Sequence, residues 1–183
     1  MKIENGVLSD VRDSDIFGSF KIPNNVTSIG DKTFVYCRDL QSLVIPDSVT
    51  TIGDKAFYCC YNLQSIEIPN SVTTIGDKAF FCCRNLQSVV IPDSVTTIGD
   101  DTFCFCESLQ SISIPDSVTK IGKFVFSDCY KLKSVVLPAT IKYITSGFFE
   151  NCSNLTDITI SKDCEIELGA FKGCTSLQHV HEI

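Results

Sequence analysis

A 23-residue repeat constrains this chain more than any other feature of its sequence. The six prolines all fall at this interval, and columns of Phe, Cys and Leu keep the same register. The phenylalanine column runs Phe34, Phe57, Phe80, Phe103, Phe126, Phe149, and Phe171 closes a last copy that is one residue short. Self-similarity at a fixed period is the mark of a repeat architecture, so we expect stacked units rather than one central core.

One copy can be interpreted residue by residue. Ile66 and Ile68 alternate with polar residues, which predicts a strand with one buried face, and Pro69 ends it. The β-branched stretch 72–75 predicts a second short extended piece. Gly76 is expected to allow a turn, and Asp77 to cap a helical turn that carries Ala79, Phe80 and Cys83.

Stacked copies bury what a single copy cannot, because each apolar residue then lies over its equivalent in the next coil. Copies of equal length place identical strands side by side, so the sheet must be parallel. The fold class predicted is a repeat solenoid of about seven 23-residue coils, with a parallel sheet and short helical turns.

The motif Leu-x-x-Ile-x-Ile-Pro-x-Ser-Val-Thr-x-Ile-Gly-x-x-Ala-Phe-x-x-Cys-x-x-Leu resembles the leucine-rich repeat of BspA-like proteins, over about residues 16–183. The resemblance implies a right-handed β/α superhelix. It also implies a non-enzymatic protein, displayed on microbial surfaces and used for adhesion and binding of host proteins. Residues 1–22 are interpreted as an N-terminal cap with the first strand, and residues 23–183 as the solenoid, together one domain. The cap, residues 3–8, is expected to pair with the first coil around Phe20 and Ile22.

Composition argues against several function classes. The chain has 15 basic and 22 acidic residues and a net charge of −7, so no basic face is available for nucleic acid. No apolar stretch is long enough for membrane insertion. No Ser-His-Asp set, carboxylate pair or phosphate loop is evident, so we expect neither enzyme activity nor a cofactor.

Three sets of polar or reactive residues have structural explanations. The cysteine column, Cys60 to Cys152, lies in an apolar register and is expected to hold buried, reduced thiols; disulfides between coils and zinc are the alternatives. The aspartate columns, such as Asp31 to Asp100, are expected to cap turns rather than bind calcium. His179 and His181 share one face of a last strand, without an evident third metal ligand.

Residues that depart from the repeat indicate an interaction surface. Between the buried Phe and Cys, the last three copies carry polar residues, whereas the early copies carry aromatic ones. We expect these to be exposed on one flank as a protein-binding surface: Tyr36, Tyr58, Tyr61, Phe81 and Phe105. Half-burial against neighbouring side chains is the alternative. A concave strand column, including Val44, Glu67 and Val90, would share the ligand.

The expected function is therefore adhesion or host-protein recognition at a microbial cell surface, with a protein ligand of unknown identity. The alternative is an intracellular scaffold or self-assembling module. It is favoured by the missing apolar signal region at residues 1–6 and by the odd number of 11 cysteines, which indicate a cytoplasmic location instead of a secreted or surface one. Self-association would use the aromatic flank or the open C-terminal end. The shortened copy predicts an altered turn around residues 164–168.

Overall fold

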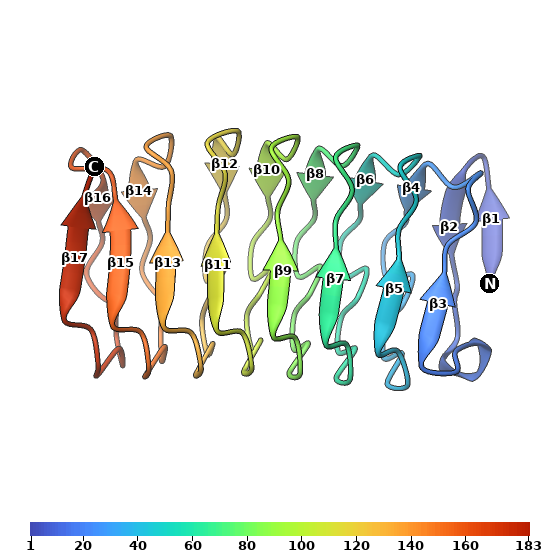
Figure 1. Cartoon of the computed structure of the whole chain (residues 1–183), viewed down its shortest axis with the longest axis horizontal. Coiled ribbons are helices and arrows are strands. Elements are labelled where there is room, and N and C mark those ends of the chain that lie inside the picture. Colours follow the sequence, from blue (N-terminus) through green and yellow to red (C-terminus); the bar gives the residue numbers. More distant parts are fainter.

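The computed structural model describes residues 1–183 and shows a solenoid of about eight turns with a row of short strands on each of two opposite faces (Figure 1). The predicted repeat solenoid with parallel strands is confirmed. The extra turn comes from residues 1–22, which contribute strands to both faces. The helical turns were not found: the sole helix is the 3-10 segment η1 (Asp13–Asp15), and tight turns replace the others.

The front face carries eight strands, and in five of the three-residue strands the middle residue is buried in the core. The eight strands are β3 (Ser19–Lys21), β5 (Ser42–Val44), β7 (Ser65–Glu67), β9 (Ser88–Val90), β11 (Ser111–Ser113), β13 (Ser134–Val136), β15 (Asp157–Ile160) and β17 (His179–Glu182). Their hydrogen bonding is intermittent: β3 pairs with β5, β7 with β9, and β11, β13, β15 and β17 form one ladder.

The back face begins with an antiparallel hairpin and continues as a parallel sheet. Its strands are β1 (Lys2–Glu4), β2 (Val7–Ser9), β4 (Ser28–Ile29), β6 (Thr51–Ile52), β8 (Thr74–Ile75), β10 (Thr97–Ile98), β12 (Lys120–Ile121), β14 (Tyr143–Ile144) and β16 (Glu165–Ile166). The sheet is continuous from β1 to β12, and β14 and β16 form a separate pair.

The N-terminal cap pairs with a different strand from the one predicted. Leu8 of β2 lies beside Ile29 of β4, so the hairpin extends the back sheet and does not pair with Phe20 and Ile22 on the front. Leu8 is completely buried, because it occupies the same column as Ile29, Ile52 and Ile75. The hairpin thus covers the first coil with a residue that matches the core.

The core is a set of ladders that run along the solenoid axis. Phe34, Phe57, Phe80 and Phe103 are completely buried and stack with ring centroids 5.1–5.5 Å apart. The stack continues through Phe126 and Phe149 to Phe171. Since each ring needs a ring on either side, burial depends on the neighbouring coils, as the repeat predicts.

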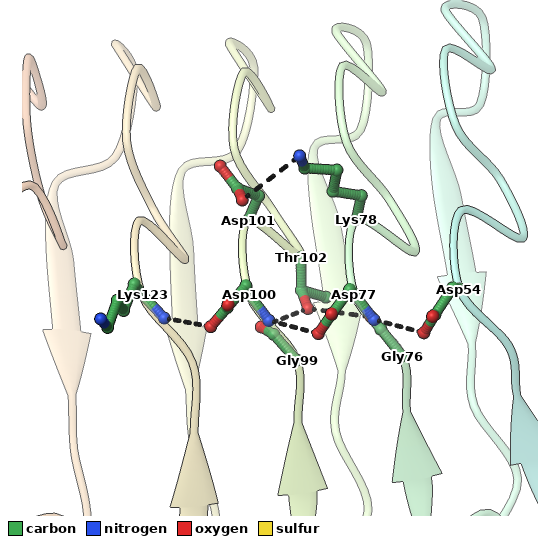
Figure 2. A network of polar contacts seen from close by, with 9 residues as sticks. All are labelled: Asp54, Gly76, Asp77, Lys78, Gly99, Asp100, Asp101, Thr102 and Lys123. Carbon is green, nitrogen blue, oxygen red and sulfur yellow. Dashed lines mark hydrogen bonds and ion pairs between the residues drawn. The ribbon is translucent and has the colours of Figure 1, made fainter.

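The aspartate column joins coils, and the prediction that Asp77 caps its own turn was wrong. The Oδ1 atom of Asp77 accepts the backbone N–H of Asp100 in the next coil at 2.8 Å (Figure 2). Asp31, Asp54 and Asp100 accept the equivalent N–H of the coil that follows each of them, at 2.8–2.9 Å. The second aspartate column, which includes Asp93, is exposed and makes no such bond.

Two further columns bind coils together through side chains. Ser71 Oγ donates to Val49 O of the preceding coil at 2.6 Å, and Ser48, Ser94, Ser117 and Thr140 repeat this bond. The thiol of Cys83 donates to Phe57 O at 3.2 Å, with Cys37, Cys60, Cys106, Cys129, Cys152 and Cys174 in the same role toward their preceding coils. Each junction therefore has a set of side-chain bonds besides its backbone ladder.

The glycine column is required by close approach between coils, rather than by an unusual backbone conformation at the turn. A Cβ atom on Gly76 would lie 2.8 Å from the carbonyl carbon of Gly53 and 2.7 Å from the backbone nitrogen of Asp54. The left-handed turn positions lie elsewhere, for example at Lys55 with φ 56° and at Cys59 with φ 59°. A side chain in the glycine column would therefore push two coils apart.

Candidate functional site

The predicted aromatic residues form a ladder along one side of the early coils. We call Tyr36, Tyr58, Phe81 and Phe105, with the adjacent Tyr61, the aromatic flank. Tyr36 packs edge-on against Tyr58 at 5.8 Å, Tyr58 stacks on Phe81 at 4.9 Å, and Phe81 meets Phe105 edge-on at 5.5 Å. Tyr36 is 51% exposed, as expected, whereas the other four are half-buried against neighbouring side chains, which was the alternative. The rings are thus held by one another and keep an accessible edge.

Tyr61 lies between two arginines, an arrangement that the sequence analysis missed. The guanidinium carbons of Arg38 and Arg84 are 5.6 and 5.4 Å from its ring centroid. These three residues share one 23-residue column, so the signal was present in the register of the repeat. A hydrogen bond with the Cys59 thiol raises the pKa of Tyr61, and partial burial acts in the same direction. Cationic groups therefore border the aromatic rings.

Two members of the aromatic flank occupy left-handed turn positions. Tyr36 and Phe105 both have φ 59°, and the last coil places Gly173 in this column with φ 80°. A left-handed conformation costs an L-residue about 1–2 kcal/mol, whereas glycine adopts it without that cost. The turn itself therefore gains nothing from an aromatic residue at these positions.

The aromatic ladder ends where the sequence changes to polar residues. The positions that follow Phe105 in its column are Asp128 and Asn151, whose side chains are joined by a hydrogen bond of 2.9 Å. Three exposed aromatic residues of the later coils were missed: Phe124 and Tyr143, which fall outside the columns considered, and Tyr130, which lies in the column of Tyr61.

The strand column on the front face is exposed, as its polar alternation predicted. Val44 and Val90 are 59% and 66% exposed, and Glu67 lies between them. Shallow grooves run beside them: one of about 320 Å³ is lined by Val44 and Glu67, and one of about 430 Å³ by Val90 and Val136. This column and the aromatic flank occupy different parts of each coil.

The eleven cysteines are all free thiols, and nine of them are buried. The predicted burial of the cysteine column is therefore correct up to Cys152, and Cys174 in the last coil is half-buried. Desolvation by burial raises the pKa of Cys37 to about 12 and the pKa of Cys106 well above its ordinary value. These thiols stay protonated at neutral pH, in keeping with their role as donors to backbone carbonyls of the preceding coil.

The two histidines are joined by a third polar group that the sequence did not reveal. Asp157 of β15 lies 3.1 Å from His179 Nδ1 and 3.6 Å from His181 Nε2. Hydrogen bonding from Thr156 lowers the pKa of Asp157, and the two histidines contribute in the same direction. No cluster of three or more His, Cys, Asp or Glu side chains is arranged as a metal centre. None of the helical segments has the length and apolar character of a membrane span.

The C-terminal coil leaves apolar columns uncovered. Ile144 is completely buried, whereas its neighbour Ile166 is 44% exposed, and Leu168 is 98% exposed. The missing residue of this copy lies between Cys164 and Glu165: Cys164 repeats the turn bond of Ile141, but Glu165 pairs with Tyr143, one residue short of the usual interval. The altered turn is thus at the start of the predicted region.

Comparison with known proteins identifies the family. The model of the BspA type leucine rich repeat region matches residues 12–103 and 73–182, in 6 copies. A leucine-rich repeat protein of T. pallidum is 35% identical, with a TM-score of 0.82 over 87% of this chain and 78% of that one. A leucine-rich repeat protein of Bacteroides ovatus is 29% identical, with a TM-score of 0.68 over 87% and 47% of the two chains.

The pneumococcal vaccine antigen PcpA shares the fold at 21% identity, with a TM-score of 0.63 over 93% of this chain and 38% of that one. None of the curated proteins compared with the chain matches it. The match of the repeat model along almost the whole chain, together with the observed solenoid, shows that the chain belongs to the BspA-type leucine-rich repeat family.

Proposed function

We propose that this chain is a protein-binding module that does no chemistry of its own and uses the aromatic flank as its contact surface. One observation carries the proposal: rings from four successive coils form a continuous ladder in turn positions where the later coils fold with Ser, Asp, Glu and Asn. Coil stacking therefore does not require them. Interfaces are enriched in aromatic residues and arginine, and Arg38 and Arg84 lie at the edge of this surface.

The setting that the family resemblance favours is adhesion or host-protein recognition at a microbial cell surface. The front column of Val44, Glu67 and Val90 would widen the contact, because its grooves lie alongside exposed strand residues. Fractionation of the source cells would separate this setting from an intracellular scaffold.

The test replaces Tyr58, Phe81 and Phe105 together by Ser. Each anchor covered by a partner contributes about 1–3 kcal/mol to binding, so the triple variant should lose partners that the parent protein retains. The matched control is Phe124→Ser with Tyr143→Ser, which removes exposed aromatic residues outside the columns of the flank. If both variants lost their partners equally, or if the triple variant unfolded, the rings would have a role in folding and not in binding.

Self-assembly through the C-terminal end is a second candidate. Ile166, Leu168, Val180 and Ile183 are exposed together at that end, where the hydrophobic columns stop. Sedimentation velocity should show concentration-dependent association that Leu168→Glu abolishes and the aromatic triple variant leaves unchanged. A protein that stays monomeric at all concentrations would exclude this candidate.

A further inference from the structure

The back sheet is interrupted at one junction. Every neighbouring pair from β2 to β12 is hydrogen-bonded, and so are β14 and β16, but β12 and β14 are not. These two strands stand further apart than the other neighbouring strands of this face (Figure 1). Lys120, Ile121, Lys142 and Tyr143 line an open cavity of about 500 Å³ at this junction, which we call the seam.

The glycine column is interrupted at the seam. The column runs from Gly30 to Gly122, and a Cβ on Gly122 would lie 2.5 Å from the carbonyl carbon of Gly99. The next residue in the column is Thr145, whose Cβ prevents the same approach. Its Oγ1 atom is also the one buried side-chain polar atom without a hydrogen-bond partner. The coils remain joined on the front face, where β11 pairs with β13, and just before the seam, where Thr140 Oγ1 donates to Val118 O at 2.6 Å.

Backbone groups at the seam lack the partners that their equivalents have. One coil earlier, Thr119 N donates to Thr96 O at 3.0 Å and Gly122 N donates to Ile98 O at 2.9 Å. No such bond joins Lys142 N to Thr119 O, or Thr145 N to Ile121 O. Donors on one side of the opening and acceptors on the other are what an added strand requires.

The side chains at the seam indicate the chemistry of that strand. The columns that hold Lys120 and Lys142 contain threonine or serine in the earlier coils, so the two exposed lysines enter at this junction. Ile121 and Ile144 face inward on the two sides. Asp77 and Asp100 line the far end of the cavity, where the carboxylate of Asp100 already accepts the N–H of Lys123. Carboxylates at the outward positions of an inserted strand would pair with the lysines.

We propose that the seam binds an extended peptide segment of a partner protein, which adds a parallel strand between β12 and β14. The segment carries acidic residues toward Lys120 and Lys142, then a β-branched apolar residue inward and a glycine beside Gly122. The cavity has the size of ordinary ligand sites, about 300–1,000 Å³. This site does not include the aromatic flank, so either can fail without the other.

Three labelled peptides built on residues 96–100 of the chain, the part that matches the open stretch, test the proposal by fluorescence anisotropy. The acidic peptide is Glu-Glu-Ile-Gly-Asp, the neutral one is the natural Thr-Thr-Ile-Gly-Asp, and the basic one has two lysines in place of the threonines. The acidic peptide should bind at least about tenfold more tightly than the basic one, with a preference that weakens as salt rises. No saturable binding up to about 1 mM, or equal binding of all three, would overturn the proposal.

Two variants locate the site. Lys120→Glu with Lys142→Glu changes exposed side chains and should reverse the preference among the peptides. Thr145→Gly should close the seam and abolish binding, while the aromatic triple variant should bind as the parent does. Hydrogen exchange should slow at the amides of Lys142 and Thr145 when the acidic peptide binds. Protection confined to the free edge of β17, or undiminished binding by both seam variants, would show that the site is elsewhere.

Discussion

Asp100 donates its backbone N–H to the Oδ1 atom of Asp77 at 2.8 Å, across the junction between two coils. Because the acceptor belongs to one coil and the donor to the next, the bond forms only when the two coils are stacked. Asp77→Ala should lower the free energy of unfolding by about 1 kcal/mol, and Asp77→Asn should restore most of it, since an amide oxygen still accepts. Urea unfolding measures both. Asp93→Ala is the control, since Asp93 is exposed and makes no bond between coils; an equal loss there would assign the effect to charge.

Substitutions at two positions of the glycine column are expected to have opposite effects on stability. Gly76→Ala should cost about 1–3 kcal/mol, because its Cβ would press on the backbone of the preceding coil. Thr145→Gly should instead stabilise the protein by about 1 kcal/mol, since new backbone bonds outweigh the entropy that glycine loses on folding. Thermal unfolding compares the two variants. Destabilisation by both would mean that Thr145 is not the cause of the open junction.

The buried thiols predict a sharp loss of stability in alkali. Burial raises the pKa of Cys83, Cys106 and Cys129 in the folded state above the ordinary value of 9.0. Their contribution is complete below pH 9 and is lost as the pH rises above it, because the unfolded chain then releases protons that the folded chain retains. Each such thiol lowers the free energy of unfolding by about 1.4 kcal/mol per pH unit in that range.

Urea titrations between pH 8 and 10 measure this slope. Cys106→Ala should flatten it by one proton, whereas Cys164→Ala should change it little, because Cys164 is half-buried. A pH-independent stability up to pH 10 would contradict the assignment of protonated thiols.

The phenylalanine stack predicts a difference between the middle and the end of the solenoid. Phe80→Ala should cost about 3–5 kcal/mol, because Phe80 is completely buried between two stacked rings. Phe171→Ala should cost about half as much, since Phe171 has a ring on one side and is partly exposed. Equal costs, measured by urea unfolding, would indicate that the last coil is covered in solution.

The sequence predicts the ladders well, because a fixed period places equivalent residues over one another. Phe80 and Cys83 lie in the core, Ile66 points inward from a strand, and Ile75 lies in a second strand, as their columns indicated. The cap could not be aligned in this way, since Leu8 precedes the first complete copy and has no column of its own.

The direction of a polar contact could not be predicted from spacing. An aspartate after a glycine fits the start of its own turn and an amide of the next coil equally well, and the structure of Asp77 shows the second. The sequence shows that Thr145 departs from the glycine column. Its effect on the distance between two coils could not be predicted, because that effect depends on how closely the backbones approach in the stacked structure.

The three side-chain columns that join the coils run in one sense along the chain: aspartate accepts from the coil that follows, and serine and cysteine donate to the coil that precedes. Equivalent bonds therefore recur every 23 residues along the chain, and each coil can pair with any other coil of the same length. Removing residues 70–92 would join Pro69 to Asp93 and bring together two coils that already carry matching donors and acceptors. Each such excision would shorten the array by one strand spacing, about 4.8 Å, and leave the bonds at the other junctions between coils unchanged.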